Sequence, residues 1–352
     1  MLRYGGLVKW YHAGFRIHSL GSDPPLPNQQ FEYGGQCMQP IAVFCKDPVL
    51  SVYWTLTDFC NFSCNYCPSF LHSGEYHKGI SKGFPTDEQI ISFVDKLEEL
   101  SKTRKLEITL SGGEPTLHPM LPYIIDRLRD ICILCITSNG SRGSDWWETI
   151  LPVSTVQLSL HPEFTKSSKI NSLSRLIIDS GTILRYNLSC DPNNWEKVLA
   201  LYDDLDDEFK PFVTPRVLQH WGAQAEVKRI SYTYSQEQSI WIKETLKKHR
   251  PVNPVNKSDY KMFFSDGSTI SAHKMGTIVL NEWNDFKGWK CYAGSQSINA
   301  TYSGDVFAGV CGSKFLGKID NFELFNEHII CDRHRCVCMP DIRANKQLII
   351  PE

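Results

Sequence analysis

The sequence predicts an α/β protein, built as a partial (β/α)6 parallel barrel that is followed by a small C-terminal domain containing a β-hairpin. From Leu50 to Leu218, apolar β-branched runs alternate six times with helical patterns, and the connections are short. Units that alternate in this way form a parallel sheet with right-handed crossovers. After His220 the alternation stops. Further on, alternating runs flank Ser303-Gly304-Asp305, which indicates a hairpin.

Each strand of the predicted barrel is a short apolar run that a helical pattern follows. The expected strands cover residues 50–57, 105–110, 131–137, 155–160, 182–190 and 212–218. The expected helices cover residues 86–102, 119–130, 145–151, 167–180 and 193–209, with another at 236–249 beyond the barrel. The first helix has a clear start, because Thr86 can cap it and a Glu/Gln pair follows.

The chain of 352 residues is long enough for a barrel-sized domain and a smaller one. We expect four parts: an N-terminal extension at 1–49, the barrel at 50–220, a connecting segment at 221–288 and the C-terminal domain at 289–352. The extension is expected to pack on the outside or the bottom of the barrel. The connecting segment is expected to line part of the substrate cavity.

The formal net charge is −2 and the isoelectric point is near 6.6, so neither a nucleic acid nor a membrane is expected as a partner. No run approaches the roughly 18 apolar residues of a membrane span. Residues 1–20 lack the apolar core of a secretory signal, and we expect a cytoplasmic protein. Because the cytosol keeps thiols reduced, the 13 cysteines indicate metal binding or catalysis rather than disulfides.

Three cysteines, Cys60, Cys64 and Cys67, lie on one short loop directly after the first predicted strand. Three thiolates on one loop can hold three irons of a 4Fe-4S cluster and leave the fourth iron without a protein ligand. That open iron can bind a small molecule and act on it. A zinc site is the alternative, although zinc usually adds a second cysteine pair downstream.

A second motif, Ser111-Gly112-Gly113-Glu114-Pro115, ends the predicted strand at 105–110. Its glycines can let a ligand approach the backbone closely, and Glu114 can accept hydrogen bonds from an amino group. With both motifs in this order, the chain from about Leu50 to Leu218 resembles the radical S-adenosylmethionine (radical SAM) superfamily. Tyr66, immediately before the third cysteine, also matches the cluster loop of that family.

The resemblance implies that Cys60, Cys64 and Cys67 hold a 4Fe-4S cluster whose open iron is chelated by SAM. The segment from Ser111 to Pro115, including Gly112, Gly113 and Glu114, would bind the methionine amino group. The reduced cluster would cleave SAM to a 5'-deoxyadenosyl radical, which takes a hydrogen atom from the substrate. The electron is expected from a flavodoxin- or ferredoxin-type donor.

Polar residues at the ends of the third and fourth strands are further candidates, because catalytic groups in such sheets lie at the C-terminal strand ends. The resemblance would put Thr137, Ser138 and Asn139 near the adenosyl part of SAM, although Ser138-Asn139-Gly140 is also a plain turn sequence. Ser159 would offer a polar side chain to the ribose. The ring of His161 could do the same, or it could cap the following helix.

On the fifth strand, Arg185, Asn187 and Ser189 alternate with apolar residues, so they share one face. In a barrel covered by helices, this face points into the lumen, where Arg185 and Asn187 could contact SAM or the substrate. Arg216 on the sixth strand could pair with a carboxylate, including that of SAM. A structural ion pair is the alternative for each arginine.

The C-terminal part has its own set of five cysteines, Cys291, Cys311, Cys331, Cys336 and Cys338. The predicted hairpin would bring Cys291 and Cys311 together, and a helix or turn is expected at 322–327. This pattern resembles the twitch domain, a short form of the SPASM domain of radical SAM enzymes. The resemblance implies one auxiliary 4Fe-4S cluster, with two of Cys331, Cys336 and Cys338 completing it. His328 and His334 leave zinc as an alternative.

These features predict an enzyme, a radical SAM oxidoreductase or maturase that oxidises or cross-links a ribosomal peptide. An epimerase or dehydrogenase of a small sugar or aminocyclitol is the enzymatic alternative. Cys190 could then return a hydrogen atom to the substrate, unless it is a buried apolar residue like Cys132 and Cys135. A non-catalytic iron-sulfur sensor or electron carrier is a third interpretation.

Overall fold

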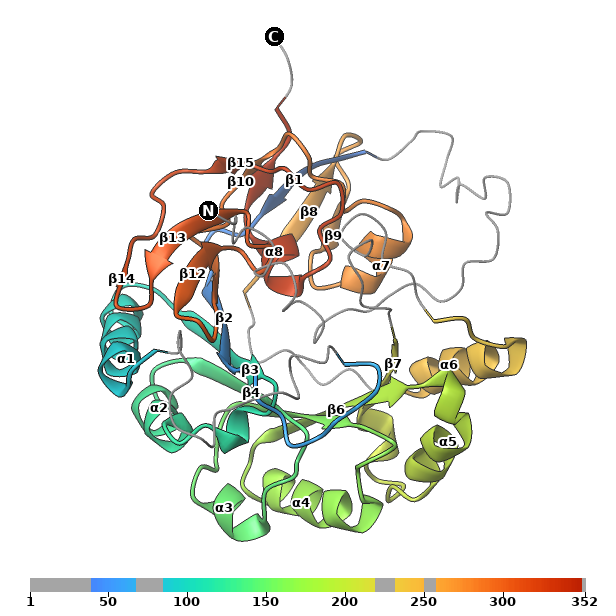
Figure 1. The fold of residues 1–352 in the computed structure, drawn as a ribbon. Helices are drawn as coiled ribbons and strands as arrows, with labels where there is room; N and C mark the ends of the chain where they lie inside the picture. Colours follow the sequence, from blue (N-terminus) through green and yellow to red (C-terminus); the bar gives the residue numbers. More distant parts are fainter. Residues whose placement is uncertain (1–38, 68–84, 219–231, 250–257, 350–352) are drawn as a thin grey trace, which may run out of the picture.

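The computed structural model describes residues 39–67, 85–218, 232–249 and 258–349. Its larger sheet has ten strands in the order β14-β13-β12-β11-β2-β3-β4-β5-β6-β7. Neighbouring strands from β2 to β7 are parallel. β7 ends the sheet, so the barrel is open (Figure 1). The predicted α/β class is confirmed, with these six strands: β2 (Leu50–Thr57), β3 (Leu106–Gly112), β4 (Ile133–Ser138), β5 (Thr155–Leu160), β6 (Ile183–Cys190) and β7 (Val213–Val217).

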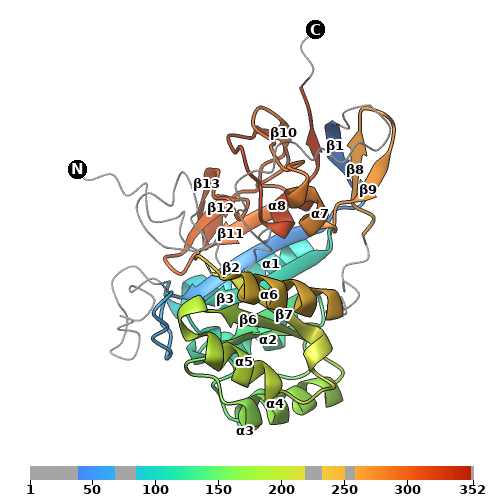
Figure 2. The ribbon, with the colours of Figure 1, turned by 90° about the vertical axis from the view of Figure 1, so that its right-hand side faces the viewer.

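Helices cover the outer face of this parallel sheet (Figures 1 and 2). The first begins where the sequence predicts, since the Thr86 hydroxyl accepts from the Gln89 amide and the Gln89 side chain accepts from the Thr86 amide. The helices are α1 (Asp87–Ser101), α2 (Leu121–Leu128), α3 (Ser144–Glu148), α4 (Ser167–Asp179), α5 (Trp195–Asp203) and α6 (Gln236–Lys248). Short 3-10 turns are η5 (Pro115–Leu117), η6 (Pro192–Asn194) and η7 (Lys210–Phe212).

The helix predicted at 193–209 was too long, because α5 ends at Asp203. Leu205 and Phe209 continue the helical spacing of Val198 and Leu201, and all four side chains are buried in one core. The chain after Asp203 is nevertheless held by Asn171, whose amide donates to the Asp204 carbonyl at 3.1 Å. Non-helical backbone therefore supplies the last two apolar contacts.

Side chains alternate between the two faces of the parallel sheet. One set packs under the helices, for example Val52, Trp54 and Leu56 on β2. The opposite set forms what we call the lumen face, which the helices do not cover. It includes Tyr53, Thr55, Ser111, Thr137, Gln157, Ser159, Arg185, Asn187, Ser189 and Arg216.

The predicted C-terminal hairpin is present and continues the barrel sheet. Its strands are β11 (Ser297–Ala300) and β12 (Asp305–Ala308), which pair antiparallel. β11 pairs with β2 in parallel, with Asn299 opposite Tyr53. β13 (Lys314–Lys318) and β14 (Asn321–Phe322) complete this edge. No helix forms at 322–327.

A second, six-stranded sheet combines segments that are far apart in the sequence. Its order is β15-β10-β16-β1-β8-β9. Part of the N-terminal extension forms β1, which pairs with β8 and β16 (Figure 1). The elements are β1 (Pro40–Phe44), β8 (Lys261–Phe264), β9 (Thr269–Ser271), β10 (Lys290–Cys291), β15 (Ile329–Ile330) and β16 (Lys346–Gln347), with α7 (Met275–Leu280) and α8 (Met339–Arg343) nearby. The described helices include none that is long and apolar enough to cross a membrane.

Candidate active site

The loop after β2 carries the three predicted cluster cysteines at the C-terminal edge of the sheet. Cys64 is buried, and Cys60 and Cys67 are half-buried. The thiols lie close enough to perturb one another. The hydrogen bond from the Cys67 thiol, followed by that with His161, lowers the pKa of Cys64 to about 4. Burial raises the pKa of Cys60 to about 12.

The loop is also docked onto the residue that follows β5. The ring of His161 is stacked on that of Tyr66, with centroids 6.0 Å apart, and His161 Nδ1 lies 2.8 Å from the Tyr66 hydroxyl. The same nitrogen lies 3.4 Å from Cys64 Sγ. His161 caps the next turn with its backbone, since its carbonyl accepts from the Phe164 and Thr165 amides. Its ring therefore contacts the cluster loop and does not cap the following helix, while the predicted contact with the ribose stays a prediction.

The Gly-Gly segment at the end of β3 holds the base of the same loop. The Gly113 amide donates to the Thr57 carbonyl at 2.8 Å, and the Glu114 amide donates to the Phe59 carbonyl at 2.7 Å. A Cβ on Gly112 would lie 2.4 Å from the Thr57 carbonyl oxygen. The sequence interpretation gave the glycines to a ligand. In the structure, the backbone that approaches them is that of the cluster loop.

Glu114 is fully buried, and its carboxylate is occupied by donors from the protein. One oxygen accepts from the Thr116 amide at 3.0 Å, the Thr116 hydroxyl at 2.6 Å and the Ser138 hydroxyl at 2.8 Å. The other accepts from the Asn139 amide at 2.6 Å. Burial raises the pKa of Glu114. Its carboxylate therefore fixes the end of β4 to the end of β3, while the second oxygen keeps a lone pair beyond its bond to Asn139.

Asn139 extends this link to the cluster loop. Its side-chain amide donates to Asn61 Oδ1 at 3.0 Å and points toward Cys60 Sγ, 3.8 Å away. Ser138 is buried and bonds to Glu114 and to the Gly140 amide. Both predicted residues thus lie at the strand ends beside the three cysteines, and Pro115 begins the turn η5 between them.

Arg216 and Asn187 meet on the lumen face. Arg216 Nε donates to Asn187 Oδ1 at 2.7 Å, while one terminal nitrogen of the guanidinium is buried without a partner. Burial lowers the pKa of Arg216 to about 10, so it remains charged at neutral pH. Ser159 pairs with Asn187 across β5 and β6. A buried cation with an unused donor fits an anionic group such as a carboxylate.

A model of the radical SAM superfamily matches residues 54–206, from β2 to just beyond α5. This chain contains a radical SAM domain. Enzymes of this superfamily use SAM and a 4Fe-4S cluster. The three thiols of one loop and the unpaired guanidinium on the lumen face fit that pair of cofactors.

Curated relatives match parts of this chain. The GTP 3',8-cyclase of Psychromonas ingrahamii (strain DSM 17664 / CCUG 51855 / 37) is 39% identical over 101 residues, which are 27% of this chain and 28% of the relative. The GTP 3',8-cyclase of Haemophilus influenzae (strain 86-028NP) is 30% identical over 156 residues, covering 40% and 44%. The matched part is thus less than half the length of these relatives.

Two solved structures are similar in fold. Native anSMEcpe with bound AdoMet has a TM-score of 0.46 and 17% identity, with 77% of this chain and 78% of that chain covered. Streptococcus suis SuiB bound to precursor peptide SuiA has a TM-score of 0.45 and 11% identity, with 76% and 61% covered. At these TM-scores the likeness carries no argument about function.

The structure does not bring Cys190 to the lumen of the radical SAM domain. Cys190 is fully buried in the core under the helices, on the face opposite to Asn187 and Ser189. Its thiol donates to the Leu188 carbonyl at 3.6 Å, and burial raises its pKa to about 12. This placement corrects the hydrogen-donor interpretation and agrees with a small apolar core residue.

Four of the five C-terminal cysteines surround one buried pair of charges. Lys346 interacts electrostatically with Cys291, Cys331 and Cys336, and Asp341 interacts with Cys311 and Cys336. Asp341 also orders the end of the hairpin, because its carboxylate accepts from the Cys311 amide at 2.7 Å, the Val310 amide at 2.9 Å and the Ser297 hydroxyl at 2.6 Å.

The fifth, Cys338, lies in a separate apolar contact with Tyr53 and Val310. It therefore borders the lumen face. Among the described residues, no three His, Cys, Asp or Glu side chains surround the position of a single metal ion. A 4Fe-4S cubane instead takes one thiolate on each of its irons.

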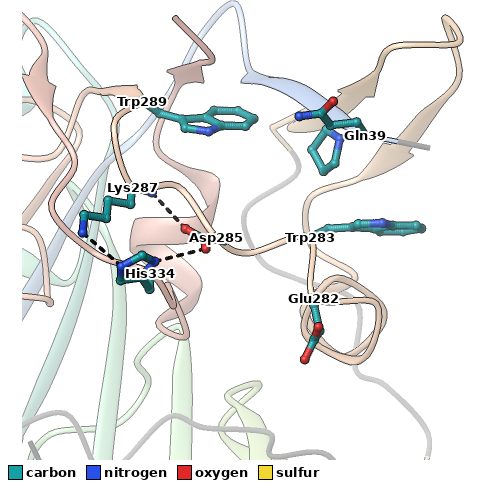
Figure 3. A pocket seen from close by; sticks show the side chains of 8 residues that line it. Gln39, Glu282, Trp283, Asp285, Lys287, Trp289 and His334 are labelled. Atoms are coloured by element: carbon teal, nitrogen blue, oxygen red, sulfur yellow. Dashed lines mark hydrogen bonds and ion pairs between the residues drawn. The ribbon is translucent and has the colours of Figure 1, made fainter. Parts of the chain in front are cut away.

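A surface pocket of about 430 Å³ lies between the start of β1 and the chain segment 282–289, with His334 also in its lining (Figure 3). Trp283 and Trp289 form two of its walls, and Asp285 accepts from the Lys287 amide at 3.1 Å and lies 3.3 Å from His334 Nδ1. None of its lining residues belongs to β2–β7.

Sequence reasoning missed several residues of the site. The backbone of Thr57 and Phe59 had no signal, because carbonyl contacts leave no trace in residue identity. Thr55 and Gln157 did leave a signal in the sequence. The alternation of side chains between the two faces of a strand, which indicated Asn187 on β6, also applies to β2 and β5.

Proposed function

We propose that this chain is a radical SAM oxidoreductase or maturase that cleaves SAM reductively and removes a hydrogen atom from a peptide substrate. The observation that carries the proposal is the three-cysteine loop, bonded at its base to Gly113 and Glu114, together with the buried, unpaired nitrogen of Arg216 on the lumen face. When bound, the cluster and SAM would supply a carbon radical that abstracts hydrogen. The protein has to hold, orient and shield the reactants.

Each residue has a role in that task. Cys60, Cys64 and Cys67 would hold the cluster. Arg216 would bind the SAM carboxylate through its unpaired nitrogen, while Asn187 fixes the plane of the guanidinium. A charge-assisted bond in a buried site is strong, because water does not compete for the donor. Tyr66, held by His161, would border the SAM site beside Ser159.

For the C-terminal region, we propose an auxiliary 4Fe-4S cluster on Cys291, Cys311, Cys331 and Cys336. The shared electrostatic contacts with Lys346 and Asp341 support this set. Cys338 packs against Tyr53 and Val310 and also interacts electrostatically with Cys336, and we leave it out of the proposed set. The cluster would accept the electron that the substrate radical loses when it is oxidised. Zinc on the same thiols would not perform that step.

A small polar metabolite is the second candidate substrate. The curated relatives are named for GTP, a small polar molecule, and this favours it. The reaction would then be the epimerisation or dehydrogenation of such a metabolite. A sensor or electron carrier would form no deoxyadenosine at all.

Iron content and SAM cleavage test the proposal together. The wild type and a Cys60/Cys64/Cys67 triple alanine variant are reconstituted anaerobically, and deoxyadenosine is assayed with dithionite as reductant. We expect about eight irons in the wild type and about four in the variant, which forms no deoxyadenosine. Cys338→Ala should keep about eight irons, whereas Cys336→Ala should keep about four. Wild-type protein that binds iron without forming deoxyadenosine would contradict the proposal that this chain is a SAM-cleaving enzyme.

A further inference from the structure

Asn299 on β11 is fully buried, and both polar atoms of its side chain lack a hydrogen-bond partner. Buried side-chain amides are nearly always bonded, because an unpaired buried donor or acceptor destabilises the fold. Its two neighbours on the same face follow that rule. The Ser297 hydroxyl donates to Asp341, and Thr301 Oγ1 accepts from the Asp305 amide at 3.1 Å.

The side chain of Asn299 belongs to the lumen face. Ile298 and Ala300 on either side are part of the core under the helices, so Asn299 points the other way. It pairs in register with Tyr53 on β2, whose hydroxyl donates to Ser111 Oγ at 3.0 Å. Asn299 is therefore on the wall that β11 and β2 share.

Thr55 is the next lumen residue along β2, in the direction of the cluster loop. Its side chain is 1% exposed, and its hydroxyl also lacks a partner. Because Asn299 is opposite Tyr53, Thr55 is its diagonal neighbour, within reach of one bound group. Thr55 precedes Cys60 by five positions. The two unpaired side chains thus lie on neighbouring strands, Asn299 on the C-terminal hairpin and Thr55 on the strand that leads into the cluster loop.

We infer that Asn299 and Thr55 form a substrate subsite that binds the backbone N–H and C=O of one residue of an extended peptide. The inference rests on the proposed function and specifies its substrate class. A side-chain amide offers N–H donors and an acceptor oxygen, and one residue of an extended peptide presents its own carbonyl and N–H on the same side. A carboxylate would leave Asn299 Oδ1 unpaired, and an ammonium would leave Nδ2 unpaired. Thr55 can donate to the same carbonyl or accept from the next amide.

The first test is the stability of the ligand-free protein. Asn299→Leu removes two unpaired polar atoms and keeps the number and branching of the side-chain heavy atoms, so the apparent Tm should rise by roughly 2–6 °C. The matched control is Ser297→Ala on the same strand and face. It removes a bonded hydroxyl and should lower the Tm. A fall in Tm for Asn299→Leu would mean that the amide supports the fold, and would overturn the subsite.

The second test is binding of N-acetylalanine N-methylamide, which has two peptide bonds, to the reconstituted enzyme with SAM, followed by saturation-transfer NMR. We expect binding to the wild type and at least about tenfold weaker binding to Asn299→Leu and Thr55→Val. Acetate and methylammonium should not compete. Equal binding to all three proteins, or none to the wild type, would overturn the inference. Deoxyadenosine from the wild type without substrate tests the proposed function separately, and matching iron contents show that the variants are loaded.

Discussion

The carbonyl oxygen of Phe59 lies 2.2 Å from the position that a Cβ on Gly113 would take, closer than any real contact allows. The next residue, Glu114, donates its amide to the same oxygen at 2.7 Å. Position 113 must therefore be glycine, because the backbone of the cluster loop leaves no room there for a Cβ. The Gly-Gly-Glu segment acts as a clamp for the cluster loop, and its carboxylate ties that clamp to β4.

Gly113→Ala should detach the cluster loop from β3. The new methyl group must displace backbone atoms of Asp58 and Phe59, which are not free to move like a side-chain end. We expect a loss of about 2 kcal/mol or more in the free energy of unfolding, and the loss of the iron that Cys60, Cys64 and Cys67 hold. Thermal unfolding and iron analysis after reconstitution measure both.

The matched control is Gly143→Ala, because a Cβ there would meet nothing within 4 Å and the backbone has an ordinary φ of −68°. It should change neither iron content nor Tm appreciably. If Gly113→Ala retained full iron, the clamp would be unnecessary for loading the cluster.

Local pattern predicted the strands well, and contacts between distant segments explain what it missed. β5 begins and ends where the apolar run does, at Thr155 and Leu160. In contrast, two of the donors to Glu114, Ser138 and Asn139, lie some 25 residues away, so these bonds could not be seen from the motif. The parallel pairing of β11 with β2 was also invisible, since the hairpin pattern says nothing about a third strand.

Arg216→Met should weaken SAM binding. The wild-type guanidinium is buried, is oriented by Asn187 and has a donor to spare, so its removal deletes a charge-assisted bond. We expect at least about a 30-fold loss of affinity, equivalent to about 2 kcal/mol. Arg216→Lys keeps the charge and should lose less. Equilibrium dialysis of SAM against reconstituted protein measures both variants.

The control for this change is Arg175→Met, an exposed arginine that pairs with Asp206 on the surface. Its SAM affinity should match that of the wild type. If Arg216→Met kept both its fold and its affinity for SAM, Arg216 would have a structural role and would not bind SAM.

Cys190→Ala should leave turnover intact and lower stability slightly. The thiol is buried under the helices, away from the lumen, so its loss leaves a small cavity that costs about 1 kcal/mol. Product formation and deoxyadenosine formation should both persist. Lost turnover with continued SAM cleavage would contradict this placement and restore the hydrogen-donor role. Cys135→Ala, at a half-buried thiol on the opposite face of the sheet, is the comparison.

His118 should make the fold sensitive to acid. Its side chain is 5% exposed, and burial lowers its pKa to about 4 from the ordinary value of 6.5. Between these two values the unfolded chain binds the proton and the native protein does not, so stability is full above pH 6.5 and falls as the pH drops toward 4. The loss should approach about 3 kcal/mol.

His118→Asn can keep the acceptor that Nδ1 provides to the Met120 amide, and it carries no titrating group. Urea unfolding of both proteins at pH 7.0 and 5.0 should therefore show a larger loss for the wild type. Parallel losses would mean that other groups cause the acid sensitivity.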